Sequence, residues 1–126
     1  MAGEQILIVD DTEMNRKLLQ VLLGAKGYRV STASSAEDAL VELARTPPVL
    51  MLLDLRLPGM SGLALARKLR SDPTYADLVI IAVTANAMKG DEEDALAAGC
   101  DAYITKPINT RSFPALIATH LAGRRR

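Results

Sequence analysis

Short hydrophobic runs divide the chain at regular intervals. Uninterrupted apolar runs cover residues 6–9, 49–53, 78–83 and 102–104. Their continuity predicts strands that are buried on both faces, as in a parallel sheet, because a strand with one face in water would alternate. Residues 28–32 do alternate between apolar and polar positions, which predicts an edge strand.

Amphipathic helices are predicted between these strands. Apolar residues recur at three- and four-residue steps in the segments 14–22, 36–44, 63–70 and 113–121. The segment 87–98 is rich in alanine and acidic residues but has little apolar face, so we expect it to form the loosest helix.

The ends of these helices are marked by residues that favour caps. Ser35 and Asp38 fit a capping box, and Asn109 is predicted to be the N-cap of the last helix. Gly27 and Gly99 stand where helices should end. Successive strands therefore start every 21 to 29 residues, and each interval holds one strand and one helix. Right-handed crossovers then give an α/β fold of the (βα)5 type, one parallel sheet with helices on both faces, whose strand order the pattern leaves open.

The composition narrows the class of protein. A length of 126 residues suits one domain, and 49% hydrophobic with 24% charged residues is typical of a globular protein. Fifteen basic and fifteen acidic residues give no net charge, which argues against binding nucleic acid or a membrane by bulk charge. The single cysteine, Cys100, excludes an internal disulfide, and we see no signal peptide and no apolar run near the roughly 20 residues that span a bilayer. We therefore expect a cytoplasmic domain.

Polar residues follow four of the predicted strands at their carboxyl ends, where ligands bind in such sheets. They are Asp10 and Asp11, Asp54, Thr84, and Lys106. Two like charges 4 Å apart repel by about 4 kcal/mol at an effective dielectric constant of 20. A cluster of three acids is therefore unfavourable unless a bound cation neutralises it. Carboxylate oxygens suit Mg²⁺, and a lysine with a hydroxyl suits a phosphoryl group. An aspartate at a strand end can also simply cap the next helix, and for Asp10 or Asp11 alone that interpretation is preferable.

Four segments together resemble the receiver domain of two-component response regulators. They are residues 6–11, 52–62, 83–85 and 103–107. The resemblance extends over about residues 5–122 and implies a flavodoxin-like three-layer sandwich with a five-stranded parallel sheet of order 2-1-3-4-5.

The resemblance also implies roles for individual acids. Asp54 would be the phosphoacceptor, taking a phosphoryl group from a histidine of a sensor kinase or of a phosphotransfer protein. Mg²⁺, which Mn²⁺ could replace, would bind Asp11 directly, Asp10 through water, Asp54, and the backbone carbonyl of Arg56. Arg56 and Asn86 would flank the phosphoryl group, and we expect them to tune its lifetime.

The switch is likewise implied by the resemblance. Lys106 would pair with a phosphoryl oxygen, held by a cis peptide bond to Pro107. Thr84 would move toward the phosphoryl group and Tyr103 would turn inward behind it. The surface of the fourth helix, fifth strand and fifth helix would then change and regulate a partner protein, or pair two copies of the chain.

These features together predict a single receiver domain over residues 1–126, with a basic tail at 123–126, that acts as a switch rather than as an enzyme with a separate substrate. It would contact neither nucleic acid nor membrane. Two alternatives to a stand-alone receiver remain. The chain could be a receiver cut from a larger regulator or hybrid kinase, or it could be a degenerate interaction module. A haloacid-dehalogenase phosphatase would need a second Asp where Arg56 stands. We expect His120 and Cys100 to be packing residues and the acidic run 91–94 to be a solvated helix start.

Overall fold

Five parallel strands form one sheet in the order β2-β1-β3-β4-β5, which confirms both the fold class and the strand order. The computed structural model describes residues 3–85 and 90–123. The strands are β1 (Gln5–Val9), β2 (Arg29–Ala33), β3 (Leu50–Asp54), β4 (Val79–Thr84) and β5 (Ala102–Thr105). The helices are α1 (Glu13–Gly24), α2 (Ala36–Arg45), α3 (Gly62–Arg70), the short 3-10 helix η1 (Pro73–Tyr75), α4 (Asp91–Ala97) and α5 (Phe113–Ala122).

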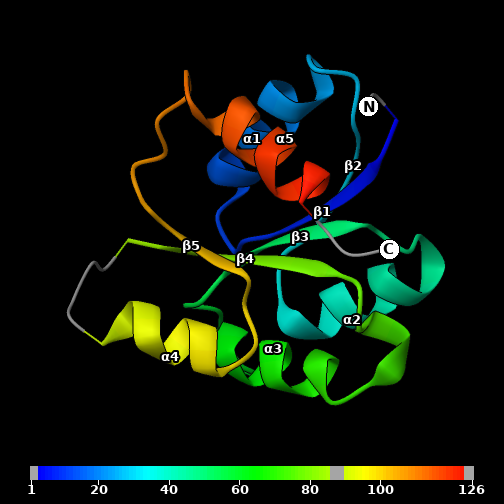
Figure 1. Ribbon diagram of the computed structural model, residues 1–126, viewed down its shortest axis with the longest axis vertical. Coiled ribbons are helices and arrows are strands. Elements are labelled where there is room, and N and C mark those ends of the chain that lie inside the picture. The colour runs from blue at the N-terminus through cyan, green and yellow to red at the C-terminus, as the bar shows by residue number, and fades with distance from the viewer. Residues whose placement is uncertain (1–2, 86–89, 124–126) are drawn as a thin grey trace.

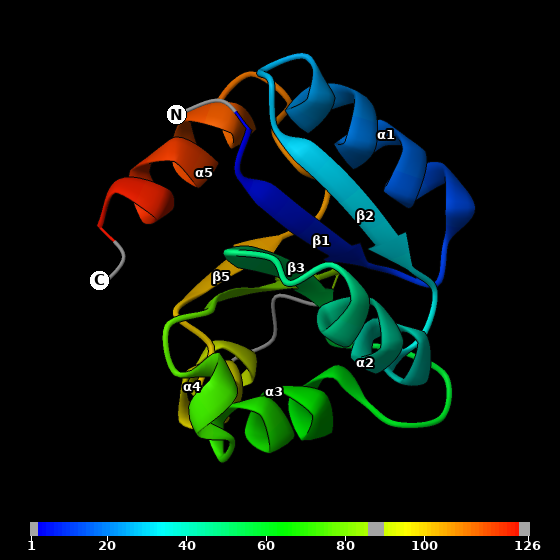
Figure 2. The ribbon, with the colours of Figure 1, turned by 90° about the vertical axis from the view of Figure 1, so that its right-hand side faces the viewer.

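The helices cover both faces of the sheet and make a three-layer sandwich. Helices α1 and α5 lie on one face, and α2, α3 and α4 lie on the other (Figures 1 and 2). Alternate residues of β1 enter opposite cores: Ile6 and Ile8 pack toward α1 and α5, whereas Leu7 and Val9 pack toward α2 and α3. Because both faces of the central strands are buried, their sequences are continuously apolar, as predicted.

The edge position of the alternating segment is also confirmed. Strand β2 stands at one end of the strand order, beside β1, and its first residue, Arg29, is exposed while Ala33 is buried. Strand β3, which ends in Asp54, lies between β1 and β4. The order of the sheet therefore brings the ends of β1, β3, β4 and β5 side by side at one edge.

Two predicted helix starts need correction. Helix α5 begins at Phe113 with Ser112 as its N-cap, so Asn109 is not the N-cap. The Asn109 side chain instead accepts hydrogen bonds from the N–H groups of Arg111 and Ser112, at 3.0 and 3.2 Å, and closes the turn before the helix. Pro114 stands in the first turn of α5, where its missing N–H costs no hydrogen bond.

Helix α4 is shorter than the segment 87–98 predicts. It begins at Asp91, after Gly90 adopts a left-handed conformation with φ of 99°, which a right-handed helix cannot pass through. Residues 87–89 of the predicted helix, Asn86 and the basic tail from 124 onward lie outside the described residues. The Ser35 cap is confirmed, since its Oγ accepts a hydrogen bond from the N–H of Asp38 at 3.1 Å. Among the helices of the described residues, none is long and apolar enough to cross a membrane.

Candidate phosphoacceptor site

A lysine joins two buried acids at the carboxyl edge of the sheet. Asp10 follows β1 and Asp54 ends β3, and the two residues are 2% and 6% exposed. The ammonium of Lys106, which follows β5, lies 3.1 Å from Oδ2 of Asp10 and 3.1 Å from Oδ2 of Asp54. The backbone N–H of Lys106 also donates a 2.7 Å hydrogen bond to the carbonyl of Thr84 on β4, which anchors the start of this side chain.

Asp11 completes a cluster of three carboxylates. One oxygen from each of Asp10, Asp11 and Asp54 lies within 4.8 Å of the others, and Asp11 is the exposed member. Three anionic oxygens at this spacing, open to solvent on one side, fit a hard cation that keeps part of its water shell. The donor set therefore suits Mg²⁺, with room for water on the Asp11 side.

Backbone groups hold the Asp54 carboxylate in place. Its Oδ1 accepts a hydrogen bond from the N–H of Arg56 at 2.9 Å, and the N–H of Leu55 bonds the carbonyl of Val83 on β4 at 3.2 Å. Burial raises the pKa of Asp54, and the hydrogen bonds from Arg56 and Lys106 only partly offset that rise. Asp54 is thus a fixed, poorly solvated carboxylate, which is what a nucleophile for an anionic phosphoryl group requires.

The pKa of Lys106 is shifted by two opposing causes. Burial lowers the pKa, but the hydrogen bonds to Asp54 and Asp10 and the charges of these two acids outweigh burial and raise it. Lys106 therefore stays cationic between the acids. Its peptide bond to Pro107 is cis.

The two residues expected to form the switch lie on neighbouring strands. Thr84 ends β4 and is 2% exposed. Tyr103 on β5 pairs with Ala82 of β4 and is half-buried against the core on the α4 side of the sheet. Burial raises the pKa of Tyr103, and the charges of Asp91 and Glu92 at the start of α4 raise it further. Asn86, expected to flank the site, lies outside the described residues.

Helix α1 supplies two contacts to Asp10 that the sequence analysis missed. The guanidinium of Arg16 donates a 2.7 Å hydrogen bond to the backbone carbonyl of Asp10. The amide of Asn15 donates a 3.4 Å bond to Oδ2 of the same residue, and the N–H of Thr12 bonds its Oδ1 at 2.8 Å. Arg16 is half-buried, six residues after Asp10 and outside the apolar stripe of its helix, so the pattern gave no sign of this contact.

A cavity opens beside the cluster. Its volume is about 480 Å³, and it lies between α1 and the segment after β5, with Asp10, Leu18 and Lys106 among its lining residues. A ligand that approaches Asp54 from this side would contact α1 on one flank and Pro107 on the other.

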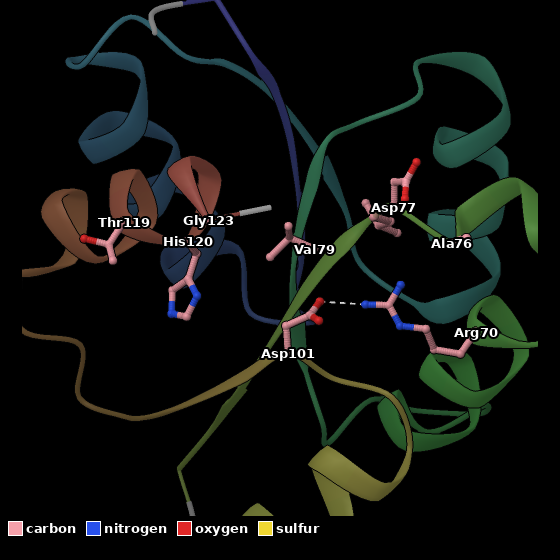
Figure 3. Close-up of a pocket in the computed structure, with 9 residues that line it drawn as sticks. Arg70, Ala76, Asp77, Val79, Asp101, Thr119, His120 and Gly123 are labelled. Atoms are coloured by element: carbon pink, nitrogen blue, oxygen red, sulfur yellow. Dashed lines mark hydrogen bonds and ion pairs between the residues drawn. The ribbon is translucent and has the colours of Figure 1, made fainter. Parts of the chain in front are cut away.

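A second cavity of about 480 Å³ lies at the amino-terminal ends of the strands, near the start of β4. Figure 3 shows His120 of α5 on one side of it and the ion pair of Arg70 and Asp101 on the other. His120 is half-buried and lies beside Val79, the first residue of β4, so it is remote from Asp54 as expected. Cys100 is 5% exposed and belongs to the core, also as expected.

Comparison with known proteins identifies the family. The sequence matches the response regulator receiver domain over residues 6–118. It is 43% identical over 119 residues to the polar-differentiation response regulator DivK of Brucella ovis, an alignment that covers 94% of this chain and 96% of that protein. The chain therefore belongs to the response regulator receiver family, the signalling switches of two-component systems, which interact with histidine kinases and downstream targets.

Solved structures agree with this assignment. A CheY-like receiver domain protein from Methanospirillum hungatei JF-1 superposes with a TM-score of 0.88 at 32% identity, covering 96% of this chain and 95% of that one. The receiver domain of the sensor histidine kinase PA1611 from Pseudomonas aeruginosa PAO1 superposes with a TM-score of 0.87 at 31% identity, covering 97% and 100%. That structure has a magnesium ion coordinated in its active site cleft.

Proposed function

We propose that Asp54 accepts a phosphoryl group from a phosphohistidine of a sensor kinase or phosphotransfer protein. The observation that carries the proposal is the Lys106 ammonium 3.1 Å from both Asp10 and Asp54 within a cluster of three acids. The carboxylate of Asp54 is held by the N–H of Arg56 on one oxygen and by Lys106 on the other. This arrangement orients a nucleophile and gathers positive charge beside it.

The transfer forms one bond and breaks one. An Asp54 oxygen bonds to phosphorus as the bond between phosphorus and the donor nitrogen breaks, and the leaving imidazole takes up a proton from water. Asp10, Asp11, Asp54 and the backbone carbonyl of Arg56 would hold Mg²⁺, or Mn²⁺ in its place. When bound, the ion supplies positive charge that offsets repulsion between the anionic carboxylate and the anionic phosphoryl group.

Lys106 has a separate part in this chemistry. Its ammonium already lies against Asp54, so a phosphoryl oxygen on that carboxylate would come within its reach. The contact would replace the ion pair between Asp54 and Lys106 by an ion pair between the phosphoryl group and Lys106, so the ammonium would have an anionic partner throughout. The exposed side chain of Arg56 would limit how water approaches the acyl phosphate.

The signal would leave through Thr84 and Tyr103. The carbonyl of Thr84 holds the N–H of Lys106 at 2.7 Å, so a shift of Thr84 toward the phosphoryl group is coupled to β5. Tyr103 lies beside Asp91 and Glu92 at the start of α4, whose charges raise its pKa. A rearrangement there would change the surface of α4, β5 and α5, which is where a target protein or a second copy would bind.

The donor protein would dock on α1. Met14, Leu18 and Val21 lie on one face of this helix and are 78%, 44% and 68% exposed. Leu18 of this apolar strip lines the cavity that also contains Asp10 and Lys106, so a partner covering the strip would bring its histidine beside the acid cluster. Residues 1–126 would form a single domain that works in the cytoplasm. This domain would act as a switch and would turn over no separate substrate.

The test is intact mass after incubation with phosphoramidate. The wild type should gain one phosphoryl group when Mg²⁺ is present and none when it is chelated, and Asp54→Asn should gain none. Asp72→Asn is the matched control, because Asp72 caps η1 away from the acid cluster. The proposal would be overturned if the wild type gained no mass and if beryllofluoride with Mg²⁺ did not change its thermal stability. That result would favour the degenerate interaction module.

A further inference from the structure

The backbone carbonyl of Asp10 lies just beyond the end of the β-ladder. The last paired residue of β1 is Val9, opposite Ala33 of β2 and Leu53 of β3. The N–H of Asp10 still bonds the carbonyl of Ala33 at 3.1 Å, but its own carbonyl has passed the end of the registered pairs. A carbonyl in a residue that is 2% exposed needs a donor, and the guanidinium of Arg16 supplies it at 2.7 Å.

That carbonyl belongs to the peptide group that joins Asp10 to Asp11. The group is planar, so holding its oxygen also fixes the direction in which the chain enters Asp11. The Asp11 side chain is exposed, so its backbone sets the position and direction of the Cβ from which its carboxylate reaches the cluster. The side chain of Asp10, in contrast, is held by Thr12, Asn15 and Lys106.

We propose that Arg16 is a positioning residue that sets the Asp10–Asp11 peptide for binding a divalent cation. It acts on the peptide and not on a carboxylate, so it orients the ligands without neutralising them. The half-buried side chain crosses from α1 to the end of β2, where it lines a small cavity with Ala33 and Asp38. This inference rests on the proposed function, because it takes the acid cluster to be a cation site.

A purely structural role for Arg16 makes a different prediction. Arg70 offers the comparison, because it also donates to backbone carbonyls, to Gly99 at 2.7 Å and to Tyr75 at 3.0 Å. Arg70 lies at the far edge of the sheet (Figure 3). Loss of either arginine should lower stability, but only loss of Arg16 should weaken cation binding.

The experiment is a calorimetric titration with Mg²⁺ alone, on the full chain at neutral pH, at a temperature where circular dichroism shows each variant folded. Arg16→Met keeps most of the apolar stem and removes the guanidinium donor, and Arg70→Met is its matched control. We expect the Mg²⁺ Kd to rise by about tenfold in Arg16→Met, as for loss of a residue that orients a metal ligand. The Kd of Arg70→Met should equal that of the wild type, and Arg16→Lys should fall between.

Each other outcome overturns the inference. An Arg16→Met Kd equal to that of the wild type shows that the contact does not orient the acids, and equal weakening in Arg70→Met shows a general loss of rigidity. If Arg16→Met does not fold, Arg16→Lys decides, and a Kd equal to that of the wild type then counts against the inference. A wild type that binds no Mg²⁺ overturns the proposed function as well, so the two failures are distinguishable.

Discussion

Replacing Lys106 by methionine removes the ammonium that lies between Asp10 and Asp54. Methionine keeps most of the apolar stem, so the change isolates the charge. We expect the free energy of unfolding of the metal-free protein to fall by about 3 kcal/mol at neutral pH, because two buried carboxylates lose their shared partner.

The magnitude follows from the spacing of the acids. At the 4.8 Å that bounds the cluster, two carboxylates repel by about 3.5 kcal/mol when the effective dielectric constant is 20. The Lys106 side chain is 20% exposed, and the two acid side chains are 3% and 7% exposed, so water screens the pair only in part. The expected loss lies at the lower end of the range of about 3–5 kcal/mol seen when a buried charge loses its partner.

The assay is urea unfolding of both proteins with and without Mg²⁺. The deficit of Lys106→Met should shrink when Mg²⁺ is added, because the ion then supplies the missing positive charge. It should also shrink as the pH falls. Burial raises the pKa of Asp54 and Lys106 lowers it, so without Lys106 the folded protein takes up the Asp54 proton at a higher pH than the wild type does. The unfolded chain is still unprotonated there, so proton binding stabilises the folded variant and narrows its deficit as the pH falls.

Lys17→Met is the matched control. Its ammonium pairs with Glu13 at 3.4 Å, but both side chains are more than 70% exposed, so we expect a change below about 0.5 kcal/mol. The reasoning is refuted if Lys106→Met and Lys17→Met lose the same stability, or if the deficit of Lys106→Met is insensitive to both Mg²⁺ and pH.

Three further predictions concern the scaffold. A methyl group on Gly62 would lie 2.5 Å from the carbonyl oxygen of Asp54. Gly62→Ala should therefore lower the free energy of unfolding in urea by about 2 kcal/mol and slow phosphorylation. An unchanged stability and an unchanged phosphorylation rate would refute the clash. Arg70→Met should lose about 2 kcal/mol by the same assay, since Arg70 joins three chain segments, and a change near zero would contradict this. Burial raises the pKa of Cys100 to about 11 from 9.0. Because only the unfolded thiol ionises between these two pH values, the free energy of unfolding should fall as the pH rises through that range, and Cys100→Ala should not show this fall.

The fold could be predicted because its central strands are buried on both faces. Continuous apolar runs such as residues 6–9 and 78–83 exclude a half-exposed antiparallel sheet, and their spacing leaves room for one helix each. The same logic found the site, because acids that follow buried strands of a parallel sheet must gather at one edge. Lys106 follows β5, which is separated from β3 by β4, yet its stem is long enough to bring its ammonium within 3.1 Å of Asp54.

The helix starts and the arginine contact could not be predicted, for local reasons. Asn109 is as suitable a cap as Ser112, and only the turn that its side chain closes decides where α5 begins. The start of α4 depends on the left-handed conformation of Gly90, which glycine permits but does not require. Arg16 reads as a polar residue of a surface helix until the position of the Asp10 carbonyl is known.

The most direct test of the account locates the phosphoryl group itself. Wild-type protein is phosphorylated with phosphoramidate and Mg²⁺, and borohydride then reduces the acyl phosphate, which converts the phosphorylated aspartate to homoserine. Tandem mass spectrometry reads the position. We expect homoserine at position 54 alone, because Asp54 is the acid held by both Lys106 and the N–H of Arg56. Homoserine at position 10 or 11, with Asp54 unmodified, would contradict it.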